Sequence, residues 1–435
     1  MTKRLIAGMV CAGSIAGLAA LTTSGASAGD GPMPFAPLAG SAYDAPYDAA
    51  SPWQIPAGYR QFDVSTEADL NIYPGTTNPA GNDWNDMNTV NETGRQAGRY
   101  LYRTHEVRGA NNASNGAVSV VDLKTGEAKV LVQRADWDAL DGIRWTPWGT
   151  ILFAEEADDG HLYEITLDKN DPTVAVSVQQ RDALGTMAHE GIEVDAKGNV
   201  YVIDEFRGGA IYKFVPDRRG DLSSGDLFAL SVADGGTGLD VGQGSWVKLD
   251  RTAVAANARK AVADANLAGA KISTFQRPED VEAIGNVVYI AITESELEER
   301  AAGAVLGDGR VVAIDLKTLA VSNFVKGGVN VGLERTNVTP KLTGLKNPDN
   351  LAEGPDGRLW IVEDNANSDI YVAEKDRNRD GVADEVNLFA SLTDTVAEGT
   401  GIYFGKDPHT LFVNIQHSVD VNDRTVAITN REIED

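Results

Sequence analysis

The sequence has a single cysteine, Cys11, which lies in an N-terminal segment that we expect to be removed. A chain without that segment has no thiol, so it forms no disulfide and offers no thiolate to a metal ion. The chain has only five histidines, and after residue 29 it has neither a G-x-S-x-G sequence nor a P-loop. These absences exclude zinc fingers, cysteine nucleophiles, hydrolases with a nucleophile elbow, and P-loop nucleotide-binding proteins.

Long hydrophobic runs are also scarce. The one clear run extends from Leu5 to Leu21, follows Lys3 and Arg4, and precedes the small residues 26–28. A basic start, a short apolar run and a small-residue site are typical of an export signal. We therefore predict that residues 1–28 are a signal peptide and that the protein is secreted, to the extracellular space or the cell envelope. The run is short, so we expect no retained membrane helix.

Basic residues are few for this chain length: 38 Lys and Arg stand against 64 Asp and Glu, which gives a net charge of -26. Such a surface repels nucleic acids and anionic lipid headgroups. We expect neither a nucleic-acid partner nor a membrane partner, and we expect a monomer. Where the acids lie in the fold decides whether they only solvate the protein or build a site.

One pattern recurs along the chain: an acid or amide, about eight residues of strand and turn, a glycine, and an apolar strand that ends in acids. The clearest copies read DGIRWTPWGTILFAEE (141–156), EGIEVDAKGNVYVIDE (190–205), EDVEAIGNVVYIAITE (279–294) and DNLAEGPDGRLWIVED (349–364), and looser copies begin at residues 86 and 398. Apolar and polar residues alternate within each copy, as in half-buried antiparallel strands. Six units of about four strands predict an all-β fold, a six-bladed β-propeller.

We predict that this propeller is one domain over residues 29–435, with residues 29–60 wrapping its outside. Short helical and loop insertions interrupt the repeat. The Ala-rich residues 250–269 predict a helix, and residues 327–344 predict a loop.

In a propeller, equivalent positions of the innermost strands point at one axis, so the repeat gathers scattered acids into a cluster. The acid that opens each unit would belong to a ring: Asp86, Asp141, Glu190, Glu279, Asp349 and Glu398. Acids near the end of the next strand would lie at the same face: Glu106, Glu155, Glu156, Asp204, Glu205, Glu294, Glu363 and Asp364. Other polar residues accompany them: His105, His189, Asn350, Gln416 and His417. Asp280 should point away from the axis, because side chains alternate along a strand.

The repulsion within such a cluster points to bound cations. Two carboxylates about 4 Å apart repel by roughly 4 kcal/mol at an effective dielectric constant of 20, so the carboxyls are either protonated or neutralised by metal ions. Oxygen ligands with few nitrogens suit Ca²⁺, Mg²⁺ or Mn²⁺. We predict a multi-metal centre, and the alternative is that some of these acids only cap turns.

Metal ions at the base of an acidic funnel would suit a phosphate ester, because phosphate oxygens can bridge them. Arg277 and Arg103 would then be bidentate donors to the phosphate group. The alternative for Arg277 is a salt bridge to a neighbouring acid.

A separate signal is DRNRDGVADE, residues 376–385. It has oxygen-bearing side chains at its first, third and fifth positions and then a glycine, as calcium loops do. The expected ligands of this structural calcium loop are Asp376, Asn378, Asp380 and Asp384. The alternative is a polar hairpin.

Segments spread over residues 60–420 resemble the alkaline phosphatase PhoX family, also known as DUF839. They include TPWGTILFAEE, HEGIEVDAKGNVYVIDEFRGGAIYKFVP, FQRPEDVEAI, NPDNLAEGPDGRLWIVED and LFVNIQH, in the order in which the family has them. The resemblance implies a secreted six-bladed propeller. It also implies a phosphomonoesterase whose axial site holds calcium and iron ions joined by an oxo group.

The repeat and the resemblance together give roles to single residues. The family's phosphate-contacting arginine corresponds to Arg277, and we predict Arg277, Glu279 and Glu190 as catalytic residues. Arg103 and His189 are further candidates for substrate binding. The predicted metal ligands are Glu106, Asp141, Glu155, Glu156, Glu190, Glu279, Asp349, Asn350 and Glu363.

Two departures from the family pattern stand out. Asp141 occupies the place of a cysteine that binds iron in the family, so the soft ligand is missing. We therefore expect several calcium ions, while iron, and with it full activity, is in question. Ser418 follows Gln416 and His417 where the family tends to have proline.

Three hypotheses follow from the sequence. The first is a secreted, metal-dependent phosphatase that hydrolyses small-molecule phosphomonoesters at an axial carboxylate site. The second is a calcium-dependent lactonase or esterase on the same propeller, which needs no phosphate-binding arginine. The third is a calcium-binding propeller without catalytic activity.

Overall fold

The computed structural model describes residues 32–70, 72, 84–107, 116–233, 240–294, 309–335 and 339–431. The predicted signal peptide, with Cys11, lies outside the described residues. Among the described helices, none has the length and apolar character that a membrane span requires.

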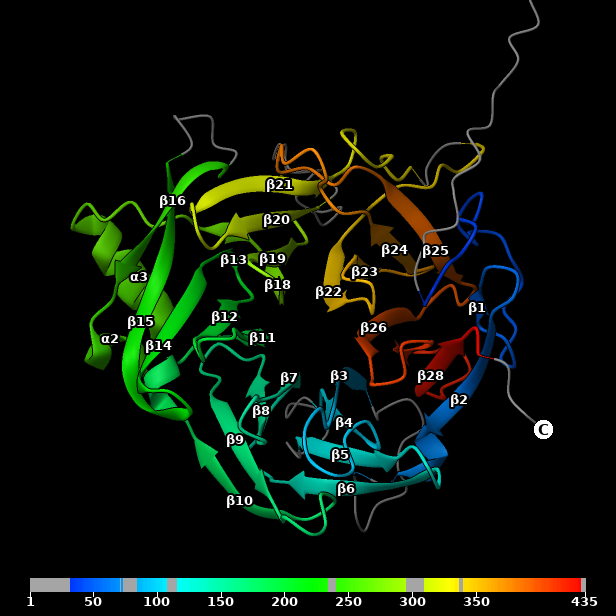
Figure 1. The fold of residues 1–435 in the computed structure, drawn as a ribbon, viewed down its shortest axis with the longest axis horizontal. Coiled ribbons are helices and arrows are strands. Elements are labelled where there is room, and N and C mark those ends of the chain that lie inside the picture. The colour runs from blue at the N-terminus through cyan, green and yellow to red at the C-terminus, as the bar shows by residue number, and fades with distance from the viewer. Residues whose placement is uncertain are drawn as a thin grey trace, which may run out of the picture.

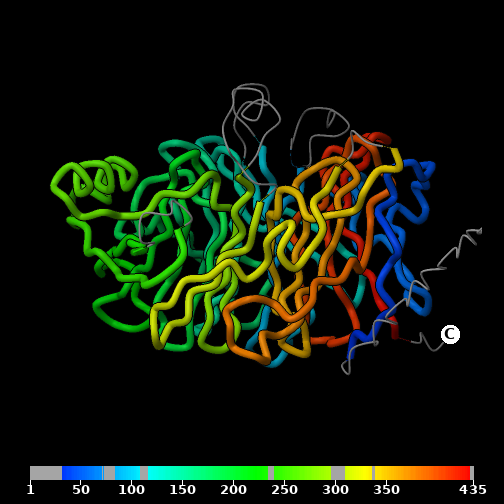
Figure 2. Tube along the Cα trace, turned by 90° about the horizontal axis from the view of Figure 1, so that it is seen from above, coloured from blue at the N-terminus to red at the C-terminus, as the bar shows by residue number. Residues whose placement is uncertain are grey.

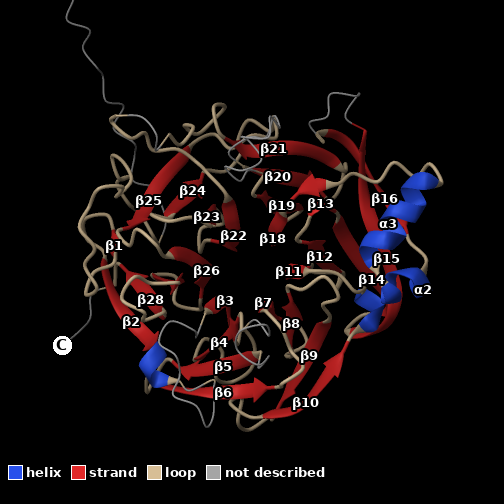
Figure 3. Cartoon of the chain, turned by 180° about the vertical axis from the view of Figure 1, so that it is seen from behind, coloured by secondary structure: helices blue, strands red, loops and turns tan. Residues whose placement is uncertain are grey.

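Antiparallel sheets stand around a common centre, and each runs from that centre to the outside (Figures 1 and 3). The first contains β3 (Asn85–Val90), β4 (Tyr100–His105), β5 (Ala117–Asp122) and β6 (Glu127–Gln133). The second contains β7 (Leu140–Trp145), β8 (Ile151–Glu155), β9 (Leu162–Leu167) and β10 (Ala175–Gln180). The molecule is a broad, flat disc when seen from the side (Figure 2).

A nine-stranded sheet follows, in which β16 joins two groups of four strands. One group is β11 (His189–Val194), β12 (Val200–Asp204), β14 (Ile211–Arg218) and β15 (Asp221–Ala233), next to β16 (Gly242–Lys248). The other is β18 (Pro278–Ile284), β19 (Val287–Ile292), β20 (Arg310–Asp315) and β21 (Ala320–Lys326). Two short strands, β13 (Arg207–Gly209) and β17 (Phe275–Gln276), pair separately.

The chain continues with β22 (Pro348–Glu353), β23 (Leu359–Glu363), β24 (Asp369–Ala373) and β25 (Val386–Leu392), with β1 (Trp53–Gln54) on the outer edge of that sheet. The last sheet contains β26 (Glu398–Phe404), β27 (Thr410–Gln416) and β28 (Arg424–Thr429). Its outermost strand is β2 (Arg60–Thr66), which pairs with β28. Strands from the two ends of the described chain therefore share one sheet.

The predicted insertions lie where we expected them, but the Ala-rich one contains two short helices and not one. The Ala-rich stretch contains α2 (Arg251–Ala256) and α3 (Ala258–Leu267), which lie on the outside of the ring (Figure 3). The side chains of Asp250 and Asn257 accept hydrogen bonds from the first turn of each helix, as N-caps do. The described part of residues 327–344 contains isolated bridges and no named strand or helix.

Apolar side chains fill the space between neighbouring sheets. Between the β22–β25 sheet and the last sheet, Trp360 and Phe389 pack edge to face with ring centroids 4.7 Å apart, and Phe35 joins them from the N-terminal segment. Trp137, Phe153 and Tyr163 form a similar cluster in the second sheet. The facing surfaces of neighbouring sheets are apolar, because each sheet covers the next one.

The innermost strands form a closed ring in the order β3, β7, β11, β18, β22 and β26, and β26 contacts β3 again. Their backbones approach closely. A Cβ atom on Gly142 of β7 would lie 1.8 Å from the carbonyl oxygen of Glu190 on β11, and one on Gly191 would lie 2.4 Å from the Asp280 Oδ1 atom. Glycine at these positions lets adjacent strands hold their acids close together.

We expect Gly142→Ala to destabilise the fold by at least ~1–3 kcal/mol, because the new methyl group overlaps backbone that cannot move without shifting β11. Chemical denaturation would measure the free energy of unfolding. The control is Gly405→Ala, since a Cβ there meets its nearest atom, in the Phe412 side chain, at 3.2 Å. Equal effects of the two substitutions would contradict the proposed close contact.

Candidate active site

Irregular pairing in the inner strands aims acids at the centre. Leu140 pairs with Glu155 and Ile143 pairs with Phe153, so Asp141 and Gly142 together stand opposite one residue of β8. A β-bulge of this kind redirects a side chain. The same irregularity falls at the corresponding acid of five inner strands: Asp86, Asp141, Glu190, Glu279 and Asp349.

These acids line a cavity of about 380 Å³ at the centre of the ring. Among the described residues, ten acidic side chains line it: Asp86, Glu106, Asp141, Glu156, Glu190, Glu205, Glu279, Asp349, Asp364 and Glu398. The other lining residues are Trp84, Arg277, Thr400, Gln416 and His417. Acidic groups therefore far outnumber basic ones among the described residues of the cavity wall.

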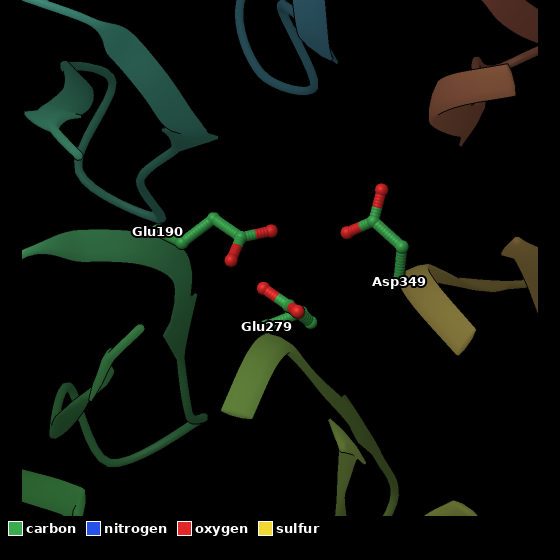
Figure 4. Close-up of side chains that lie close together, drawn as sticks. All are labelled: Glu190, Glu279 and Asp349. Carbon is green, nitrogen blue, oxygen red and sulfur yellow. The ribbon is translucent and has the colours of Figure 1, made fainter. Parts of the chain in front are cut away.

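Glu190, Glu279 and Asp349 come from three successive inner strands and point at one another (Figure 4). Each offers a carboxylate oxygen, and these oxygens all lie within 4.8 Å of one another. All three residues are buried, and Glu279 is only 2% exposed. This is the spacing at which one cation could contact three carboxylates.

The electrostatic cost of this arrangement shows in the acid pKa values. Burial raises the pKa of Glu279 to about 8, Glu205 adds to the rise, and Arg277 opposes it. Burial, followed by neighbouring acids, also raises the pKa of Glu190 and of Asp141 well above the ordinary range. The pKa of Asp349 is raised in the same way.

Two of the buried oxygens have no hydrogen-bonding partner within the described part of the chain: the Asp141 Oδ1 and Glu190 Oε2 atoms. A buried polar atom without a partner is costly. Both atoms belong to residues that line the cavity. A bound cation would satisfy them.

The second strands of three sheets, β8, β12 and β23, each end at the first of two consecutive acids. The two acids of a pair have different surroundings. Glu155 accepts hydrogen bonds from the backbone N–H groups of Asp138 and His161, at 3.1 and 3.2 Å, and it does not line the cavity. Glu156, the next residue, does line it. Glu363 likewise accepts from the N–H of Lys346 at 2.7 Å, and its neighbour Asp364 faces the cavity.

The third such pair follows the same division. Asp204 is fully buried and accepts two hydrogen bonds from Arg259, at 2.9 and 2.7 Å, whereas Glu205 lines the cavity. The first acid of each pair thus makes hydrogen bonds within the framework, and the second lines the cavity. Glu155 and Glu363, which we predicted as metal ligands, have this structural position.

Arg277 contributes the one arginine side chain in the described cavity wall. Its Nη2 atom lies 2.7 Å from the Glu205 Oε1 atom, 3.2 Å from Glu279 Oε1 and 3.7 Å from Asp364 Oδ2. Its φ of 51° is in the left-handed region, which is unusual for a residue other than glycine. The salt bridge named as an alternative is therefore present, and it is made inside the cavity.

Three further predicted residues lie around this core. Glu106 lines the cavity and accepts a hydrogen bond from Gln416 Nε2 at 3.2 Å. Asn350 is fully buried and does not line the cavity; its Nδ2 donates to Asp349 Oδ1 at 2.9 Å, so it orients that carboxylate. Asp280 accepts from the N–H of Leu351 at 2.8 Å and joins β18 to β22, away from the cavity.

The structure does not bring Arg103 or His189 to the cavity. Arg103 is buried between strands, where it donates to the hydroxyls of Ser119, Thr425 and Ser65. His189 is fully buried, its Nε2 atom lies 3.0 Å from the Gly185 carbonyl oxygen, and burial lowers its pKa to about 4. Their positions give no support to the predicted roles in substrate binding.

The last inner strand departs from the predicted ring. In β26 the irregular pairing falls between Thr400 and Tyr403, so Gly401 stands where the other inner strands have an acid. Glu398 lies three residues earlier and still lines the cavity. The prediction that Glu398 is equivalent to the other five acids is wrong, because β26 and β27 extend farther beyond the irregularity.

Trp84 and Thr400 are cavity residues that sequence analysis missed. A signal for Trp84 existed: it precedes Asp86 by two residues, as Arg277 precedes Glu279. Both residues have left-handed backbone, with φ values of 39° and 51°. Nothing comparable marks Thr400.

The predicted calcium loop lies between β24 and β25 and does not reach the cavity. Asp376 Oδ2 accepts from the N–H of Gly381 at 2.8 Å, and Asn378 Oδ1 accepts from the N–H of Asp380 at 2.9 Å. Asp384 Oδ1 accepts from the N–H of Arg377 at 3.3 Å. The loop's own amides use these oxygens, as in the polar hairpin that we considered as the alternative, and calcium binding here stays a prediction.

Comparison with known proteins identifies the family. The model of the family "Alkaline phosphatase PhoX" matches residues 144–418, which is more than half of the chain. The chain belongs to the PhoX alkaline phosphatase family. It is thus a PhoX-family phosphomonoesterase, in agreement with the resemblance seen in the sequence. A search of curated proteins found no match.

The fold resembles that of a solved PhoX structure. Pseudomonas fluorescens PhoX, in complex with the transition-state analogue vanadate, is 19% identical, with a TM-score of 0.65 over 90% of this chain and 97% of that one. A gluconolactonase from Xanthomonas campestris is 12% identical, with a TM-score of 0.47 over 89% of this chain and 98% of that one.

The residues of this PhoX-family cavity fit hard cations. Its acidic lining and the unpartnered Asp141 and Glu190 oxygens supply the ligands that Ca²⁺ prefers. They do not fit a metal held by thiolate, because no described lining residue is a cysteine and the sole cysteine of the sequence is Cys11. The backbone N–H of Ser418 donates a hydrogen bond to Asp423 Oδ1 at 3.0 Å. A proline at this position could not make this hydrogen bond, because it has no N–H.

The raised pKa of Glu279 predicts a stability that depends on pH. Between its ordinary pKa of 4.5 and about 8, the folded metal-free protein holds a proton that the unfolded chain has released. This stabilising contribution is present below about pH 4.5 and is lost as the pH rises to about 8. We expect the Tm of chelator-treated protein to fall across this window and Ca²⁺ to raise the Tm more at pH 8 than at pH 5.

Differential scanning calorimetry with and without a chelator would measure this dependence. Glu279→Gln is the control, and it should make the fall in Tm shallower because glutamine does not titrate. A Tm of the chelator-treated protein that stays constant or rises from pH 4.5 to 8 would contradict the assignment.

Proposed function

We propose that this protein is a secreted, calcium-dependent phosphatase that hydrolyses small-molecule phosphomonoesters in the central cavity. The observation that carries the proposal is the convergence of ten acidic side chains on one cavity with one arginine among them. Repulsion between these acids makes the site unfavourable without cations. We further propose that the sheets are the six blades of a propeller, with the cavity on its axis.

Glu190, Glu279 and Asp349 would hold a first cation, since their oxygens already converge. Asp141, Glu106 and Glu156 would contribute to neighbouring ions from the same wall. Bound cations supply positive charge that neutralises phosphate oxygens and lowers the pKa of water. Asn350 would keep the Asp349 carboxylate in place through its 2.9 Å hydrogen bond.

Arg277 would bind the phosphate group. Its guanidinium faces Glu205, Glu279 and Asp364, and cations bound to these carboxylates would weaken their hold on it. A guanidinium can donate two parallel hydrogen bonds to a phosphate group. Vanadate in Pseudomonas fluorescens PhoX is a transition-state analogue, which supports a phosphate ester as the substrate class here.

Glu279 and Glu190 would act by giving up protons. Each has a raised pKa in the metal-free cavity, so binding a cation, which requires the ionised carboxylate, would favour release of a proton. The resulting carboxylates would bind the cation and offset part of its positive charge. Their burial limits access by bulk water.

One alternative is a calcium-stabilised propeller that has lost its catalytic metal and does not catalyse the reaction. The observation that favours it is Asp141, which replaces the family's thiolate and so changes the metal that the site can hold. Metal analysis of the purified protein separates the possibilities. Several calcium ions per chain support the phosphatase, calcium together with iron would favour the oxo-bridged chemistry of the family, and substoichiometric metal would favour the non-catalytic protein.

We expect Glu279→Gln to lower kcat/KM for 4-nitrophenyl phosphate at least about 100-fold, because it removes one of the three convergent carboxylates. Phosphate release and bound calcium should be measured on the same samples. The matched control is Glu282→Gln on the same strand, since Glu282 is buried but pairs with Arg144 at 3.0 Å, outside this cavity. Full activity of Glu279→Gln would refute the site.

Substitution of Arg277 distinguishes a phosphatase from a lactonase. We expect Arg277→Ala to lower kcat/KM for phosphate esters by about 100-fold or more, since a bidentate charged donor is lost, and Arg277→Lys to recover only part of it. Hydrolysis of a γ-lactone should be assayed in parallel. A lactonase activity that survives Arg277→Ala, without phosphatase activity in the parent protein, would favour the lactonase.

A further inference from the structure

The wall of the cavity opposite Arg277 carries two aromatic rings, those of Trp84 and His417. They pack edge to face with centroids 5.1 Å apart and an interplanar angle of 72°. Trp84 precedes β3, and His417 follows β27 in the last sheet. Both side chains line the cavity, and the His417 side chain is 40% exposed.

The position of this pair follows from the order of the inner strands. β3 and β18 are three steps apart in either direction around the ring, so they lie on opposite sides of the cavity (Figure 1). Trp84 and Arg277 each stand two residues before the bulged acid of their strand. The two residues therefore face the same cavity from opposite walls.

The backbone holds both rings in uncommon conformations. Trp84 has a φ of 39° and His417 a φ of 61°, and bulky side chains rarely adopt the left-handed region. Such strain persists only where surrounding contacts fix it. These contacts include hydrogen bonds to one buried carboxylate, that of Asp423: its Oδ2 accepts from the Trp84 N–H at 3.3 Å, and its Oδ1 accepts from the Ser418 N–H at 3.0 Å.

We propose that Trp84 and His417 bind the leaving group of the substrate and give the enzyme a preference for phosphate esters of planar, aromatic groups. This inference rests on the proposed function. A phosphate group held by Arg277 directs the rest of the ester toward the opposite wall. An aromatic ring or a nucleoside base would stack on Trp84 there, whereas a small polyol would make little contact.

The test compares two substrates of different shape, 4-nitrophenyl phosphate and glycerol 2-phosphate. We expect the ratio of their kcat/KM values to fall at least about fivefold in Trp84→Leu, which is the lower end of the cost of losing an aromatic stacking partner. Trp84→Phe keeps a ring and should retain most of the ratio. Phe62→Leu is the control, because Phe62 is an exposed aromatic residue on β2 that does not line the cavity.

Each outcome has one meaning. An unchanged ratio in Trp84→Leu, with both activities present in the parent protein, overturns this inference and leaves the phosphatase intact. Equal losses toward both substrates also overturn it, because a general structural role would reduce them together. A parent protein that releases phosphate from neither substrate overturns the proposed function, and this inference with it. Calorimetry on each variant shows whether the fold is retained.

Discussion

Mutual repulsion between buried carboxylates is the constraint on which this molecule depends. Glu190, Glu279 and Asp349 are held within contact distance of a common point by a framework that leaves them little water. Burial and like charge both raise the pKa values of these groups, so an empty cavity retains protons and a loaded one releases them. The apolar clusters between sheets supply the free energy that keeps such a centre assembled.

The β-bulges explain how ordinary strands bring these carboxylates together. An uninterrupted strand alternates its side chains between two faces, and the bulge frees one residue from that alternation at the point nearest the axis. Asp141 can face the cavity while Gly142 accepts the close approach of β11. In β7 and β11 the bulged acid is followed directly by a glycine. The acid therefore faces the cavity while the glycine leaves room for the backbone of the next inner strand.

Much of this arrangement is readable in the sequence, because the interval from acid to glycine repeats. That interval brought Asp141, Glu190 and Asp349 to equivalent positions, and the all-β character followed from the alternation. The division between Glu155 and Glu156 was not readable, since adjacent acids look alike until the loop amides they hold are known. We predicted that Arg103 would lie at the cavity, but it is buried between strands. No sequence pattern distinguishes an arginine that donates to buried hydroxyl groups from one that faces a cavity.

The pairing of β2 with β28 also determines when the last sheet is complete. β2 lies near the beginning of the described chain and β28 near its end, yet they are neighbours in one sheet. The strands that carry the acids are made one after another, and the sheet of β26, which closes the inner ring against β3, is complete only when β28 has been made and has paired with β2. A chain that ends before β28 therefore lacks the pairing that joins its first strands to its last sheet, and the sheet beside β3 is incomplete.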